Sequence, residues 1–323
     1  MTPQEFRDIV YSFQASRIIL TSLEMEIFTV LGDNAKTSGD VANKLSSDER
    51  ATDRLMNALC TMNFLEKRNG KFSNTSFSSK FLVKGKQDYF SNIMHAVNLW
   101  DSWSGLTGTV RSGKRVTRNN DGSRNWAENF IEAMHYRAVR QAPEDVGLMD
   151  LRNIHKVLDV GGGSGAFSME IVNAKKDISV VVFDLPDIIP LTQKYIEQAG
   201  LQDKIKTIKG NYLHDDLGSG YDLIFLSAIV HSNSFEENKK LIRKCVGALN
   251  KNGQVVIQDY AMNEDRTTPA SGAFFALNML VNTEGGDTFT EKEIFSWLKD
   301  AGLNRITRKD TTHGAAQIVG MKE

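Results

Sequence analysis

HKVLDVGGGSG, residues 155–165, joins a short apolar run to a turn rich in glycine. The apolar residues and the glycines follow one another directly: Val157, Leu158, Val160, Gly161, Gly163 and Gly165. We expect a buried strand, a turn, and then a helix that begins at Ala166 and is capped by Ser164. Such a turn places unpaired backbone N–H groups and the positive end of a helix dipole beside a ligand. The stretch therefore predicts a site for a small molecule that is polar and at least partly anionic.

Two classes of ligand fit this turn. Gly161, Gly163 and Ala166 satisfy the G-x-G-x-x-G/A pattern of dinucleotide sites. The same stretch also reads acid-x-Gly-x-Gly-x-Gly with Asp159 as the acid, which resembles the first motif of class I S-adenosyl-L-methionine (SAM) methyltransferases. A carboxylate in the buried strand would repel a pyrophosphate and is costly to desolvate. The ammonium and sulfonium of SAM would give Asp159 a partner, so the pattern favours SAM over NAD.

The composition is that of an ordinary globular protein. The chain has 323 residues, enough for two domains, and its 39 basic and 40 acidic residues nearly cancel. This balance gives no large field that would attract nucleic acid or an anionic membrane. Two cysteines, Cys60 and Cys245, are too few for a disulfide scaffold, and we find neither a signal peptide nor an apolar run of bilayer length. We expect a cytoplasmic protein.

The N-terminal third is predicted to be helical. Apolar residues recur at helical spacing through residues 1–32, and shorter helices are expected at 38–45 and 48–64. A hairpin that turns at Asn69-Gly70 follows, so the order is that of a winged helix. The second short helix has a net charge of −1, which argues against DNA binding. We therefore predict an all-helical winged-helix dimerisation domain over residues 1–110, and we expect part of its apolar face to pack on a second subunit.

The remainder is predicted to be an α/β domain. Residues 111–150 form a linker, with a loop over 111–124, and a helix that contributes to the substrate pocket. From 151 to 323, strands alternate with helices, which predicts a doubly wound, mostly parallel seven-stranded sheet. Expected strands after the glycine turn are 178–184, 204–210, 221–226 and 254–260. The tail reads as two strands joined at His313-Gly314, an ending typical of class I methyltransferases, whose last strand is antiparallel.

Ligand groups in such a sheet project from the carboxyl ends of its strands. Asp184 lies 19 residues after Gly165 and suits a grip on ribose hydroxyls, in NAD and SAM alike, although it could instead cap the next helix. His231 follows the fourth strand, and its unperturbed pKa of about 6.5 suits removal of a proton from a hydroxyl. Asp259 could hold the imidazole of His231 as in a catalytic triad. Alternatively, His231 only makes structural hydrogen bonds within its loop, and Asp259 pairs with Arg266.

Together these features identify a resemblance to the dimeric O-methyltransferases of the plant caffeate and animal hydroxyindole (acetylserotonin) type, in a bacterial or archaeal-style form. The resemblance covers nearly the whole chain. Beside the winged-helix region and the His231 loop, it rests on five motifs: VLDVGGGSG (157–165), FDLP (183–186), VVIQDY (255–260), LNMLVNTEGG (277–286) and TEKE (290–293).

The resemblance implies a homodimer that moves a methyl group from SAM to a hydroxyl of a small aromatic or conjugated acceptor, leaving S-adenosylhomocysteine (SAH). It implies His231 as general base with Asp259 beside it. The implied SAM residues are Asp159, Gly161, Gly163, Asp184, Leu185, Asn211, Tyr212 and Ser227. The implied acceptor pocket is Trp103, Phe130, Met134 and Met279, which could equally be ordinary core. The sequence has no carboxylate cluster with metal spacing, so we expect no metal.

The sequence departs from the pattern of this family at three places. Ser232-Asn233 stands where an Asp-Trp pair usually follows the histidine, Asn211 replaces an acid, and Thr288 replaces a glutamate of the plant enzymes. An N- or C-methyltransferase and a SAM-binding relative without methyl transfer therefore remain alternatives. Two alternatives belong to other classes of protein, namely a SAM-sensing winged-helix regulator and an NAD-dependent oxidoreductase.

Overall fold

The computed structural model describes residues 1–116 and 126–323, and most of the predicted loop over 111–124 lies outside them. The chain divides into two compact units, Met1–Asn98 and Leu99–Glu323, with the boundary inside helix α7 (Ile93–Trp103). Among the described helices, none combines the length and the apolar content that crossing a membrane requires.

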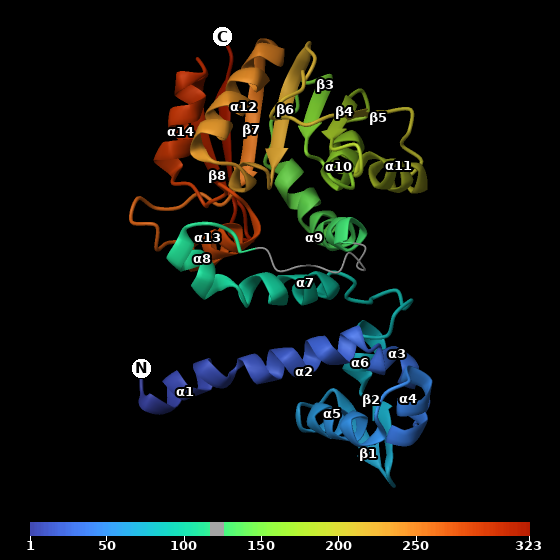
Figure 1. The fold of residues 1–323 in the computed structure, drawn as a ribbon. Coiled ribbons are helices and arrows are strands. Elements are labelled where there is room, and N and C mark those ends of the chain that lie inside the picture. The colour runs from blue at the N-terminus through green and yellow to red at the C-terminus, as the bar shows by residue number, and fades with distance from the viewer. Residues whose placement is uncertain (117–125) are drawn as a thin grey trace. The chain divides into compact units, whose positions relative to one another are not determined.

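The first unit is a set of helices around a short hairpin (Figure 1). Its elements before α7 are α1 (Pro3–Tyr11), α2 (Phe13–Glu24), α3 (Ile27–Leu31), α4 (Ser38–Leu45), α5 (Glu49–Thr61), β1 (Leu65–Arg68), β2 (Lys71–Asn74) and α6 (Ser76–Phe81). The strands pair antiparallel through Asn69 and Gly70, whose φ angles of 51° and 76° suit a tight hairpin turn. The predicted hairpin is thus confirmed. Because its two strands pair, the unit is not all-helical as predicted.

Helix α1 carries an apolar face that this unit leaves exposed. Phe6 is 58% exposed, Ile9 61% and Tyr11 59%, and no residue of α1 is buried. The core of the unit lies elsewhere, around fully buried side chains such as Phe28 and Met56. Part of the wide apolar face predicted over residues 1–32 is therefore exposed in a single copy of this unit.

The second unit is built on a seven-stranded sheet with the order β5-β4-β3-β6-β7-β9-β8 (Figure 1). Its strands are β3 (Lys156–Val160), β4 (Ser179–Asp184), β5 (Ile205–Lys209), β6 (Tyr221–Ser227), β7 (Leu249–Asp259), β8 (Asn304–Asp310) and β9 (Ala316–Met321). The first five of these run parallel, whereas β9 pairs antiparallel with both β7 and β8. The predicted doubly wound sheet and closing hairpin are confirmed.

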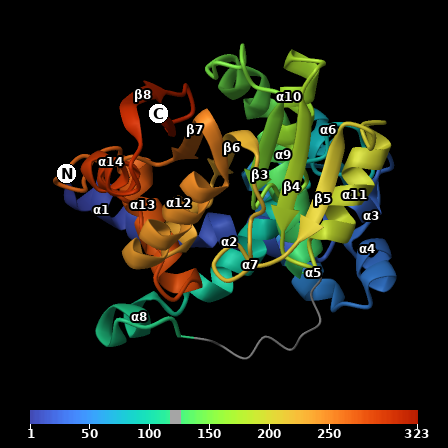
Figure 2. The same cartoon turned by 90° about the horizontal axis from the view of Figure 1, so that it is seen from above.

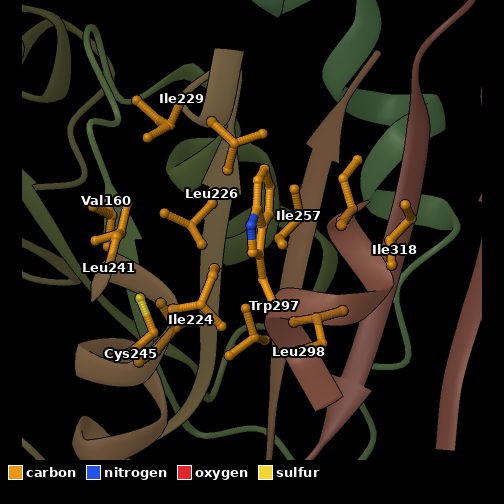
Figure 3. Packing of buried hydrophobic residues seen from close by; sticks show 14 of the residues in the cluster. Val160, Ile224, Leu226, Ile229, Leu241, Cys245, Ile257, Trp297, Leu298 and Ile318 are labelled. Carbon is orange, nitrogen blue, oxygen red and sulfur yellow. The ribbon is translucent and has the colours of Figure 1, made fainter. Parts of the chain in front are cut away.

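Helices cover both faces of this sheet (Figure 2). These helices are α9 (Trp126–Gly147), α10 (Ala166–Ala174), α11 (Ile189–Gln198), α12 (Phe235–Ala248) and α14 (Glu291–Asp300). The unit also contains α8 (Leu106–Ser112), α13 (Ala270–Asn282) and a 3₁₀ turn over Val230–Ser232. On one face, residues of α12 and α14 pack on strand residues around the fully buried Trp297 (Figure 3). On the other face, the cluster includes residues of α9, α10 and α11, such as Val146, Ile171 and Ile196.

Alternation along the strands explains both clusters. Leu158 of β3 points to the cluster around Trp297, whereas its neighbour Val157 points to the opposite cluster. A parallel sheet buried on both faces needs apolar residues on both sides of each strand. Local signals fix the starts of α12 and α14, because Ser234 and Glu237 form a capping box, as do Thr290 and Glu293.

Candidate active site

The glycine turn between β3 and α10 has a backbone that other residues would not adopt easily. Gly161, Gly163 and Gly165 have φ angles of +68°, +57° and +74°. A Cβ atom on Gly161 would also overlap the side chain of Ile229, and one on Gly162 would lie 2.6 Å from an oxygen of Asp159. The glycines therefore let the backbone of the turn lie directly against Asp159 and Ile229, and we call this turn the candidate cofactor cradle.

Asp159 lies beneath this turn rather than on its open side. Its side chain is 2% exposed and accepts a hydrogen bond of 2.6 Å from the hydroxyl of Ser168. Burial raises the pKa of this carboxyl to about 7. The expectation that Asp159 faces the charged groups of a ligand is not what the geometry shows, because the carboxylate is covered by Gly162 and partnered inside the protein. Its visible role is to anchor the start of α10 under the turn.

Asp184 ends β4 with its carboxylate at the edge of the turn. One oxygen accepts the N–H of Gly163 at 2.7 Å, and the other accepts the N–H of Leu185 at 2.7 Å. Burial raises the pKa of Asp184, whereas these two backbone donors oppose the rise. Leu185 itself is 45% exposed. A carboxylate fixed in this way and followed by an exposed apolar residue suits a ribose and a base.

Ser164 does not cap the following helix. Helix α10 begins at Ala166 as predicted, but its N-cap residue is Gly165 and no side chain caps it. The hydroxyl of Ser164 instead lies 2.8 Å from Nδ1 of His135 on α9. The expectation of a serine cap was wrong because a side chain from a distant helix competes for the hydroxyl.

The remaining predicted cofactor residues lie at the carboxyl ends of β5 and β6. Asn211 follows β5, and its side-chain oxygen accepts the N–H of Leu213 at 2.9 Å, which shapes the turn. The hydroxyl of Tyr212 donates to Asn233 at 3.1 Å, and burial raises the pKa of Tyr212 to about 12. Ser227, the last residue of β6, accepts a hydrogen bond of 3.3 Å from Gln258.

His231 and Asp259 form a pair at the same edge of the sheet. Nδ1 of His231 lies 2.9 Å from both carboxylate oxygens of Asp259, and the backbone N–H groups of His231 and Tyr260 also donate to this carboxylate. An ionised carboxylate only accepts, so Nδ1 carries the proton and Nε2 is the basic nitrogen. The side chains are 12% and 3% exposed. Parallel strands β6 and β7 bring these residues together, as the sequence predicted.

The proposed rival partner of Asp259 is engaged elsewhere. Arg266 binds both oxygens of Glu293 at 2.6 and 2.8 Å, and it also donates to the carbonyl of Thr288 at 2.8 Å. The alternative in which Asp259 pairs with Arg266 is therefore wrong. Thr288, which replaces a glutamate of the plant enzymes, is buried and donates to the carbonyl of Gly272 at 3.2 Å.

Two aromatic residues of the site were missed by the sequence analysis. The ring of Phe275 meets the imidazole of His231 edge-on, with centroids 4.8 Å apart and planes at 88°. Tyr260 packs against Phe275 at 5.1 Å. The signal was present, because Phe275 precedes Met279 by one helical turn and Tyr260 directly follows Asp259. These rings restrict which way the imidazole can turn.

The four predicted pocket residues lie on three helices. Met279 is 7% exposed on α13, and the indole N–H of Trp103 donates to Asn278 beside it at 3.0 Å. The structure thus brings Trp103 and α13 together. Phe130 and Met134 lie one turn apart on α9, and their part in an acceptor pocket stays a prediction.

Metal ligands do not gather in the described part of the chain. No group of three or more His, Cys, Asp or Glu side chains with a geometry that could hold a metal ion occurs in residues 1–116 and 126–323.

Comparison with known proteins gives the family. The model of an O-methyltransferase domain matches residues 115–304, and that of an O-methyltransferase dimerisation domain matches residues 8–84. The chain is 28% identical to 3-hydroxy-5-methyl-1-naphthoate 3-O-methyltransferase of Streptomyces sahachiroi, over 98% of this chain and 94% of that protein.

Solved structures show the same fold. PigF with SAH has a TM-score of 0.91 and 24% identity over the full length of both chains. Human N-acetylserotonin methyltransferase in complex with SAM has a TM-score of 0.84 and 21% identity, over 99% of this chain and 97% of that one. The family matches set aside the oxidoreductase and the regulator as classes. The chain belongs to the family of SAM-dependent O-methyltransferases that carry an N-terminal dimerisation domain.

Proposed function

We propose that the enzyme methylates a hydroxyl group on a small aromatic or conjugated acceptor, with His231 as the general base. The observation that carries this proposal is the orientation of the His231 imidazole, which places Nδ1 at the carboxylate of Asp259 and leaves Nε2 as the nitrogen that can accept a proton. The name of the relative from Streptomyces sahachiroi, a naphthoate 3-O-methyltransferase, supports an aromatic acceptor.

The residues present fit SAM. The glycine turn leads to the N-terminus of α10, which no side chain caps, and Asp184 stands at its edge with both oxygens oriented by backbone N–H groups. Around it we place Leu185, Asn211, Tyr212 and Ser227 as cofactor-binding residues. When bound, SAM supplies a methyl group on a sulfonium, which an oxygen nucleophile can attack. Asp159 supports the turn from beneath.

In this proposal His231 removes the acceptor proton at Nε2 as the acceptor oxygen becomes a nucleophile. Asp259 keeps the other nitrogen protonated and stabilises the imidazolium that forms, as the carboxylate of a triad does. Phe275 limits rotation of the ring. A general base contributes about 10²- to 10⁴-fold, so alignment of the acceptor and exclusion of water supply the rest. Trp103, Phe130, Met134 and Met279 would form the apolar wall that achieves both.

The remaining properties follow from the same observations. We propose a homodimer formed through the N-terminal unit, supported by its dimerisation-domain match and the exposed apolar face of α1. We propose that the reaction needs no metal, because a histidine base makes a metal-activated hydroxyl unnecessary. The near-zero net charge and the two free cysteines support a cytoplasmic enzyme without nucleic-acid or membrane partners.

The test is calorimetric titration with SAM, SAH and NAD. We expect SAM and SAH to bind, NAD not to bind, and Asp184→Ala to abolish binding. Asp187→Ala is the matched control, since Asp187 is exposed three residues further on and should bind both ligands normally. Binding of NAD alone would overturn the cofactor assignment.

An acceptor screen then tests the reaction. Hydroxylated naphthoates should be methylated on oxygen, with the same turnover in excess EDTA. Methylation of amines alone would favour the N-methyltransferase alternative, for which the similarity to the N,N-dimethyltransferase OxyT of Streptomyces rimosus gives a precedent. Tight SAH binding without turnover on any acceptor would favour the relative that has lost methyl transfer.

A further inference from the structure

His135 is a histidine that the proposed chemistry does not use. It lies on α9, 29 residues before its partner Ser164, and its Nδ1 is 2.8 Å from the Ser164 hydroxyl. Its imidazole also stacks on the ring of Tyr195 from α11, with centroids 4.0 Å apart and planes at 24°. The ring is thus fixed from two sides, by a hydrogen bond and by a stacked phenol.

The glycine turn is held at neighbouring residues by three side chains. Asp184 accepts the N–H of Gly163, and the hydroxyl of Thr192 donates to the carbonyl of Gly163 at 2.5 Å. These two contacts come from elements that follow the turn in sequence. The contact between His135 and Ser164 comes from α9, which precedes it and packs along α10. It is the contact that ties the turn to the helix of the predicted acceptor wall.

Two turns of α9 meet the glycine turn on one side. A Cβ on Gly163 would lie 3.6 Å from Ile131, and His135 follows Ile131 by one helical turn. Phe130 and Met134, the predicted wall residues, occupy the adjacent positions of the same two turns. A shift of the glycine turn against α9 would therefore move the cofactor cradle against this wall.

The state of His135 suits such a role. Burial lowers the pKa of its imidazole, so the ring is neutral near pH 7 and can accept the Ser164 hydroxyl proton at Nδ1. Because Ser164 is engaged with His135, it does not cap α10, and the N–H groups of the first turn of α10 have no side-chain cap. They stay available to a ligand in the cradle.

We propose that His135 is a positioning residue for SAM: it holds Ser164, and with it the glycine turn, in the arrangement that binds the cofactor. This rests on the proposed function, and it adds a residue that acts through Ser164 without touching the acceptor.

The experiment is a double-mutant cycle on SAH affinity, measured by calorimetry. We expect His135→Ala and Ser164→Ala each to weaken SAH binding by about 3- to 10-fold, the range of one hydrogen bond. The double variant should bind SAH with the same affinity as the single variant that binds it less tightly, because both substitutions remove the same contact. His135→Asn should recover most of the affinity, since the side-chain oxygen of asparagine can stand where Nδ1 does. His155→Ala, which changes an exposed histidine of the same unit, is the control and should bind SAH normally.

Kinetics separate positioning from a general loss of structure. The KM for SAM should rise in both single variants, while the acceptor KM at saturating SAM and the melting temperature stay close to those of the wild type. Unchanged SAH affinity in both single variants, or losses that multiply in the double variant, would overturn the proposal. Failure of the wild type itself to bind SAH would instead contradict the proposed function.

Discussion

In the second unit, two largely covered histidine–aspartate pairs involve neighbouring residues of β7, Gln258 and Asp259. His231 pairs with Asp259 itself, at 2.9 Å. His313, in the turn between β8 and β9, places Nε2 2.9 Å from Asp145, whose carboxylate also accepts a hydrogen bond of 2.8 Å from Gln258. The pairs are similarly covered, since the histidine side chains are 12% and 17% exposed and the aspartates 3% and 0%.

Burial therefore does not distinguish the two pairs, but the hydrogen bonding of the second histidine nitrogen does. Nδ1 of His313 lies 3.3 Å from the hydroxyl of Thr311, so both of its nitrogens are engaged. For His231, no hydrogen bond of Nε2 is seen within residues 1–116 and 126–323. Asp145 is also tied to two strands, because Gln317 donates to its carbonyl at 2.7 Å. A histidine of such a pair is thus a candidate base when its second nitrogen can still bind a substrate. When both nitrogens are already hydrogen-bonded, the pair has a structural role.

The largest expected effect is on turnover when His231 is removed. His231→Ala should lower kcat by about 100-fold or more, because general-base catalysis is lost. The SAH dissociation constant should change less than about twofold, since the ring is not part of the cradle. Steady-state kinetics and calorimetry measure the two quantities. His313→Ala is the control and should keep a normal kcat. Equal losses of kcat in both variants would contradict the distinction between the pairs.

The second prediction concerns Asp145 and stability. Asp145→Ala removes the buried carboxylate that binds Gln258 and His313, and breaking a buried pair typically costs about 3 to 5 kcal/mol. Urea unfolding should show a loss of this order, whereas kcat of the folded enzyme should change little. Asp187→Ala, at an exposed carboxylate, should unfold as the wild type does. A large loss of kcat without a loss of stability would mean that this pair takes part in the chemistry.

A smaller effect is expected at Asp259. Asp259→Asn keeps the shape but weakens control of the imidazole tautomer, so kcat should fall by about 10- to 100-fold. In the His231→Ala background the same substitution should cause almost no further loss, because the two residues act as one unit. A full additional loss in the double variant would show that Asp259 works independently of His231.

The two pairs also show what sequence reasoning reaches. Strand ends of a parallel sheet converge, so the meeting of His231 and Asp259 follows from the order of the strands alone. The pairing of His313 with Asp145 spans 168 residues and depends on how α9 lies against β7 and β9, which no local pattern encodes. The fold was predictable because caps, turns and alternation are local signals. Individual side-chain directions were not: Ser164 turns to His135 on a distant helix, and Asp159 turns inward to Ser168.

The smallest expected effect is a pH dependence that belongs to the structural pair. Burial raises the pKa of Asp145, although His313 and Gln258 oppose the rise and the neighbouring Glu144 adds to it. Above the ordinary carboxyl pKa of about 4, the unfolded chain releases this proton before the folded protein does. The folded state then binds more protons, so the contribution of Asp145 to stability falls as pH rises through this range. Asp145→Asn cannot lose a proton and should flatten this part of the profile.

Melting temperatures between pH 4 and pH 7 measure this effect in the wild type, in Asp145→Asn and in the exposed control Asp187→Asn. As pH rises, the melting temperature of Asp145→Asn should increase relative to that of the wild type. The difference between Asp187→Asn and the wild type should stay constant. A difference that shifts in favour of the wild type would mean that His313 holds Asp145 ionised in the fold more strongly than burial opposes it. The second pair would then be a strong ion pair. The distinction from His231 and Asp259 would rest only on Nε2 of His231, which has no hydrogen bond within the described residues.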